Sequence, residues 1–173
     1  MPGLEDLYKE IILDHYRSPR NRGELAVPPA HRVEGFNPLC GDEVVVYLEV
    51  ADGRIEDLRI SGQGCSISQS SASMMAAAVK GRTLDEVRSL SRTFKAMMSI
   101  HEASLDGDAG TAPEASAAEV ADGLTAADRE LGDLVALRGV LKFPVRIKCA
   151  TLSWNTLLQG LDEVAAGVPP AEA

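Results

Sequence analysis

EVVVYLEVADGRIEDLRIS, residues 43–61, is the stretch that decides the fold. Apolar side chains recur at every second residue of its first half, namely Val44, Val46, Leu48 and Val50. This period of two is typical of a strand with one buried face. Asp52-Gly53 is the strongest short signal for a tight hairpin turn, and residues 55–61 then form the return strand. The stretch therefore predicts an antiparallel hairpin.

Outward from the hairpin, the pattern predicts one more strand at 31–36 and several helices. The expected helices cover 4–17, 66–80, 83 to about 100, 125–138 and about 145–166. Helices around a small antiparallel sheet of about three strands make an α+β fold. The length of the chain fits a single domain spanning 1–173. Residues 102–125 hold few large apolar side chains, so we expect a mobile acidic insertion there.

The charge distribution excludes some classes of partner. The net charge is −9, but nine of the 26 acidic side chains and only one basic side chain lie within 102–133. No basic stripe is present, which disfavours nucleic-acid binding. No apolar run approaches the roughly 18 residues of a membrane span. The N-terminus lacks a secretory signal pattern, so we expect the protein in the cytoplasm and not at a membrane.

Three cysteines, an odd number, argue against a disulfide framework in such a compartment. Cys40 lies between Pro38 and Gly41, which mark a tight turn, and Asp42 follows two residues later. Such neighbours are unusual for a core cysteine. Asp42 can lie near the thiol or share a metal with it, and a functional role for Cys40 is favoured over that of an ordinary loop cysteine.

Cys65 follows Gly62 and Gly64 where a strand gives way to a helix. A helix N-terminus favours the thiolate, which is the form that binds metal or carries sulfur. The alternative is a small residue packed at a strand–helix corner. Cys149 lies near the start of the last helix, directly before Ala150. Arg146 and Lys148 precede it, and these two cations would lower the pKa of its thiol. A cysteine on an apolar helix face is equally compatible with that pattern.

Three thiolates and one carboxylate are a sensible tetrahedral zinc set. Separations of 25 and 84 residues between the cysteines are not a zinc-finger spacing, and no CxxC pair is present. The residues alone therefore allow a metal centre without requiring one. His15 lies on the apolar side of its helix and is interpreted as structural, whereas His31 could lie at the surface and His101 borders the insertion. None of the three histidines has the neighbours of a metal ligand.

Four segments resemble the U-type scaffold family of iron–sulfur cluster assembly. They are Leu7–Pro19 in the first helix, Asn37–Asp42, Gly62–Ser68 and Arg146–Cys149. The resemblance covers most of the chain outside about 102–125. Lys148 stands where the IscU-type branch has histidine, and residues 142–146 read KFPVR in place of its chaperone-docking motif. A long stretch before Cys149 is a third departure, and all three resemble the SufU branch.

The resemblance implies a zinc ion held by Cys40, Asp42, Cys65 and Cys149. It also implies a sulfurtransferase-like role, in which Cys40 accepts persulfide sulfur from a SufS-type cysteine desulfurase and stimulates that enzyme. The sulfur would pass on to a downstream SUF scaffold or to apo-proteins. Arg146 is a candidate for orienting the acceptor thiol.

Two other functions compete with this one. The same ligands could hold iron and assemble a [2Fe–2S] cluster for apo-proteins. A free-standing zinc hydrolase would need an open coordination position and a nearby base. Four protein ligands leave no such position, which disfavours the hydrolase.

Overall fold

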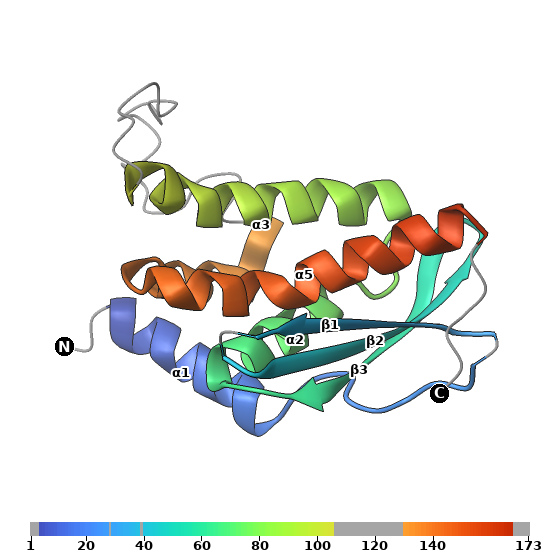
Figure 1. The fold of residues 1–173 in the computed structure, drawn as a ribbon, viewed down its shortest axis with the longest axis horizontal. Coiled ribbons are helices and arrows are strands. Elements are labelled where there is room, and N and C mark those ends of the chain that lie inside the picture. Colours follow the sequence, from blue (N-terminus) through green and yellow to red (C-terminus); the bar gives the residue numbers. More distant parts are fainter. Residues whose placement is uncertain (1–3, 28, 39, 106–129, 168–173) are drawn as a thin grey trace.

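A computed structural model describes residues 4–27, 29–38, 40–105 and 130–167 (Figure 1). The elements in chain order are α1 (Leu4–Arg17), β1 (His31–Asn37), β2 (Asp42–Ala51), β3 (Arg54–Gln63), α2 (Ser66–Val79), α3 (Leu84–Leu105), the 3₁₀ helix η1 (Gly132–Lys142) and α5 (Pro144–Ala165). Within the described ranges, no helix combines the length and the apolar character that crossing a membrane requires. The predicted α+β architecture is confirmed.

The three strands form one antiparallel sheet in the order β1-β2-β3. Val46 pairs with Val33 on one side and with Ile60 on the other, so the apolar alternation is aligned across the sheet. Asp52 and Gly53 both have positive φ, 52° and 71°. A two-residue hairpin turn of this kind needs positive φ at both central positions, which explains the Asp-Gly pair.

Helices cover one face of the sheet, and the core lies between the two layers. α5 packs on β1 and β2, α2 packs on β3, and α3 lies beyond α5 (Figure 1). Trp154 of α5 is completely buried and stacks on Phe94 of α3 with ring centroids 4.9 Å apart. This packing fixes the start of α5 beside the ends of the strands, where the cysteine motifs lie.

Two predicted helix boundaries were wrong. The helix expected to end near residue 100 continues to Leu105, so the first residues of the predicted insertion are helical. The helix expected at 125–138 is, in its described part, mainly the 3₁₀ helix η1. Four consecutive residues, 134–137, are buried there, so this segment packs on several sides instead of through one amphipathic stripe. The rest of the predicted insertion lies outside the described residues.

His15 is structural, as its place on helix α1 predicted. Its ring is buried, with Nδ1 2.8 Å from Ser73 Oγ and Nε2 3.1 Å from Asp133 Oδ2. The ring therefore joins α1, α2 and η1. Such a shared polar contact inside the helical layer stabilises their relative positions.

His31 is buried, and the prediction of a surface position was wrong. Its Nε2 lies 2.8 Å from Glu163 Oε2, near the end of α5. The strand signal alone could not show that α5 reaches the beginning of β1. The hydrogen bond to His31 lowers the pKa of Glu163 below its usual value.

Glu163→Gln is expected to lower the free energy of unfolding by about 1 kcal/mol at pH 7, because it removes a charged hydrogen-bond acceptor from His31. The pKa of Glu163 is depressed by folding. Its contribution is therefore complete above the unfolded glutamate pKa of about 4.3, and is lost as pH falls through the lower folded value. Denaturant unfolding at several pH values should show the two proteins converging below pH about 4. The exposed Glu56→Gln is the control, and equal stability of Glu163→Gln and wild type at pH 7 would contradict this account.

Candidate metal centre

The cysteine motifs meet where β1 ends, β2 begins and α5 begins. One ligand atom from each of Cys40, Asp42 and Cys149 lies within 4.8 Å of the others. The sulfurs of Cys40 and Cys149 are 3.3 Å apart although 109 residues separate them. Asp42 is the first residue of β2, and Cys149 lies in the second turn of α5. The fold thus gathers into one group three of the four residues that the resemblance implied as ligands.

Cys65 adjoins this group through Asp42. Its backbone N–H donates to Asp42 Oδ1 at 2.9 Å, and its sulfur lies 3.9 Å from Asp42 Oδ2. Cys65 is also the N-cap of α2, where its sulfur accepts from the N–H of Ser68 at 3.4 Å. The glycine-rich turn before α2 therefore places Cys65 as the sequence predicted.

The group is buried on one side and accessible on the other. Asp42 and Cys149 are completely buried, whereas Cys40 and Cys65 are half-buried. Burial raises the pKa of Cys149, and hydrogen bonds with Asp42 and Cys40 add to the shift. The prediction that flanking cations lower this pKa was wrong, because burial outweighs them and Lys148 is exposed.

The donor set fits a metal ion that takes sulfur and oxygen ligands. A buried carboxylate beside buried and half-buried thiols is costly unless a cation compensates the charge. Three sulfurs and one carboxylate oxygen satisfy the tetrahedral preference of zinc. The four residues that could hold such an ion are Cys40, Asp42, Cys65 and Cys149.

Arg146, which the resemblance made a candidate for orienting the acceptor thiol, is exposed. The charge of its guanidinium interacts with Cys65 and Cys149. The negative charge of Cys65, followed by the bond to Cys149, raises the pKa of Arg146. A permanent cation beside the two cysteines can stabilise negative charge that develops on sulfur.

Asn37 belongs to the site, and the sequence reasoning missed it. It is the last residue of β1, it is buried, and its Nδ2 donates to Cys149 Sγ at 3.7 Å. An amide that donates to a ligand sulfur helps to orient it. The available signal was its place at the start of the Asn37–Asp42 motif, directly before Pro38.

Gly64→Ala is expected to weaken zinc binding about 10-fold, since groups that position metal ligands commonly account for about 10–100-fold in affinity. A Cβ at Gly64 would lie 2.6 Å from Asp42 Oδ1 and 3.1 Å from its Cβ, so Asp42 must move. All four ligand side chains remain. Competition with a chromophoric chelator measures the effect. Gly139→Ala, which has no atom within 4 Å of the added Cβ, is the matched control. Equal affinity in the two variants would contradict the role given to Gly64.

Helices that cover an antiparallel sheet define an α+β protein. The thiols and the carboxylate at the strand ends form its candidate metal centre. Residues 7–122 match the NifU-like N terminal domain family, and the chain belongs to that family. The resemblance found in the sequence motifs is confirmed.

Relatives in this family cover nearly the whole chain. It is 38% identical over 164 residues to the zinc-dependent sulfurtransferase SufU of Bacillus subtilis, covering 95% of each protein. It is 34% identical to the iron–sulfur cluster assembly scaffold protein IscU of Streptococcus pyogenes, covering 94% of this chain and 87% of the relative. A putative iron–sulfur cluster assembly scaffold protein for the SUF system from Fervidobacterium islandicum has a similar structure. The TM-score is 0.66 at 29% identity, over 92% of this chain and 99% of the other.

Proposed function

We propose that this protein is a zinc-dependent sulfur acceptor of iron–sulfur cluster assembly that works with a SufS-type cysteine desulfurase. The observation that carries the proposal is the grouping of a half-buried Cys40 with the buried Asp42 and Cys149. Similarity to a zinc-dependent sulfurtransferase over 95% of the chain supports it. Cys40, Asp42, Cys65 and Cys149 would hold the ion, which when bound would keep the thiols deprotonated at neutral pH.

Cys40 is the proposed acceptor because it is the accessible cysteine of the group that it forms with Asp42 and Cys149. Cys40 is half-buried, whereas Cys149 is completely buried. The Cys40 thiolate attacks the terminal sulfur of the donor's persulfide. A new S–S bond forms on Cys40, the donor's S–S bond breaks, and its cysteine leaves as a thiolate. No net oxidation occurs, since the sulfane sulfur carries its oxidation state with it.

Arg146 and Asn37 complete the proposed machinery. The guanidinium of Arg146 interacts electrostatically with Cys65 and Cys149, and its charge would stabilise negative charge at the site while Cys40 reacts. Asn37 donates to Cys149 and keeps that sulfur in the buried half of the site. The persulfide on Cys40 would then pass to a SUF scaffold or to an apo-protein.

A second candidate function is a scaffold that assembles a [2Fe–2S] cluster on the same ligands. The 34% identity to an assembly scaffold favours it, as does a donor set that also suits iron. The exposed Lys148 occupies the position before Cys149, so this chain lacks a histidine ligand there. That difference favours sulfur transfer over cluster assembly.

The test is the rate of alanine formation from cysteine by a SufS-type desulfurase. Wild-type protein is expected to raise the rate several-fold, and protein stripped by a chelator is expected to raise it only after zinc is restored. A desulfurase rate that is unchanged by the zinc-loaded protein would overturn the sulfur-transfer proposal. Transfer of an intact cluster to an apo-ferredoxin would favour the scaffold instead.

A further inference from the structure

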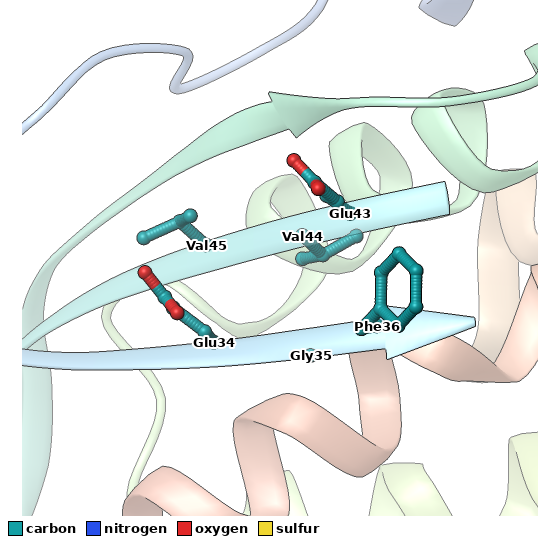
Figure 2. Close-up of a pocket in the computed structure, with 6 residues that line it drawn as sticks. All are labelled: Glu34, Gly35, Phe36, Glu43, Val44 and Val45. Atoms are coloured by element: carbon teal, nitrogen blue, oxygen red, sulfur yellow. The ribbon is translucent and has the colours of Figure 1, made fainter. Parts of the chain in front are cut away.

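A hollow lies on the sheet face next to the metal centre, between β1 and β2. Its volume is about 580 Å³, and six residues line it: Glu34, Gly35, Phe36, Glu43, Val44 and Val45 (Figure 2). In the antiparallel register, Phe36 lies opposite Glu43 and Glu34 lies opposite Val45. These four side chains stand on the same side of the sheet, and Val44 points into the core.

Phe36 separates this hollow from a second one. The second hollow, of about 470 Å³, lies between the end of β1 and α5, and its lining includes Phe36, Pro38, Lys148 and Asn155. Phe36 itself is 59% exposed. A large aromatic side chain between two depressions is suited to serve as an anchor, because aromatic residues dominate the binding energy of many protein interfaces.

The surface is continuous with the reacting thiol. Phe36 precedes Cys40 by four residues, and Glu43 directly follows the buried Asp42. Phe143 and Val145, each 62% exposed, lie before Cys149 at the start of α5. Three of the five large exposed apolar side chains in the described part of the chain therefore border the cysteine motifs. A protein that brings a persulfide to Cys40 must approach this surface.

Charge restricts the partner further. Glu43 is exposed beside Phe36, and Glu34, which forms an ion pair with Arg32, borders the other side of the hollow. The Glu43 carboxylate, beside the apolar side chains of Phe36 and Val45, favours a partner with a cationic side chain next to an apolar one.

We propose that Phe36, Val45 and Glu43 form the docking surface for the sulfur donor, and that the donor presents an apolar side chain beside a lysine or arginine. This inference rests on the proposed function, because it takes the occupant to be the protein that delivers sulfur to Cys40. The donor's apolar side chain packs on Phe36 and Val45, and its cation faces Glu43.

The experiment measures the rate of a SufS-type desulfurase at increasing concentrations of each variant. It gives two values, the variant concentration at half-maximal stimulation and the maximal stimulation. Phe36→Ser and Glu43→Lys are each expected to raise the half-saturating concentration about 10-fold, as expected for interface anchors. Maximal stimulation and zinc content stay at wild-type values. The deficit of Glu43→Lys, unlike that of Phe36→Ser, is expected to shrink as salt screens the repulsion.

Two matched controls accompany these variants. Phe36→Leu keeps an apolar side chain and is expected to stay close to wild type. Glu56→Lys makes the same charge change on β3. Gln63 of β3 pairs with Glu43, and Glu56 lies seven residues from Gln63, about 23 Å along the strand. It is expected to behave as wild type.

The outcomes distinguish a failure of the proposed docking surface from a failure of the proposed function. If wild type stimulates and both Phe36→Ser and Glu43→Lys saturate at the wild-type concentration, the docking surface is wrong and the proposed function stands. A lower maximum with unchanged half-saturation would also overturn the docking role. If wild type gives no stimulation, the proposed function has failed. Calorimetric titration of the same proteins then decides docking, and equal affinity of Phe36→Ser and wild type, or no binding at all, would overturn it.

Discussion

Cys40→Ser is expected to lower sulfur transfer by more than about 100-fold, because removal of a reacting nucleophile costs far more than loss of a binding contact. Serine keeps the size of the side chain, but its hydroxyl is a poor nucleophile at neutral pH. The sulfurs of Cys149 and Cys65 are not expected to compensate, because Cys149 is completely buried and Cys65 is held at the N-cap of α2 beside Asp42. The fold should be retained, since Cys40 is only half-buried.

Single-turnover reaction with the donor, followed by peptide mass spectrometry, measures this prediction. Wild type should carry the persulfide on Cys40, and Cys40→Ser should carry none on any cysteine. Zinc content is measured in the same samples, so that loss of the metal and loss of the nucleophile are distinguished. Persulfide that forms on Cys65 or Cys149 of the variant at the wild-type rate would contradict the role of Cys40.

Asp42→Ala is expected to weaken zinc binding by more than about 100-fold, since even outer partners of metal ligands account for about 10–100-fold. It should also destabilise the metal-free protein by about 1–3 kcal/mol, because the N–H of Cys65 loses its acceptor. Asp42 is completely buried, and this hydrogen bond measures 2.9 Å. Asp42 would thus serve both the proposed metal centre and the start of α2.

Asp42→Asn separates these two roles. Its side-chain oxygen can still accept from the N–H of Cys65, so the metal-free stability should remain near that of wild type. The amide lacks the charge that favours a zinc ligand, so affinity should fall as in Asp42→Ala. Denaturant unfolding in a chelator and zinc competition measure the two effects. An Asp42→Asn protein that binds zinc as tightly as wild type would contradict ligation by Asp42.

The sheet could be predicted from local sequence patterns, namely the apolar alternation of one strand and the turn that follows it. The alternation from Val44 to Val50 requires one buried face, and Asp52-Gly53 allows one kind of turn. The buried side of the sheet, with Val44, Val46 and Leu48, is the predicted side. Boundaries were less predictable where tertiary packing decides them, as in η1.

The metal centre could not be predicted from spacing. Its cysteines are 25 and 84 residues apart, and only the packing of α5 on the sheet brings Cys149 to Cys40. The family motifs supplied what local physics could not. The burial of His31 and the contact of Asn37 with Cys149 depend on where α5 lies. A single domain over 1–173 and a cytoplasmic location remain predictions.

The metal content of the protein as purified, determined by inductively coupled plasma spectrometry, tests the central claim most directly. Cys40, Asp42, Cys65 and Cys149 are expected to hold one zinc ion per chain, with less in the Asp42→Ala variant measured beside it. Iron together with acid-labile sulfide, or a chain that binds no metal, would contradict the zinc-dependent account.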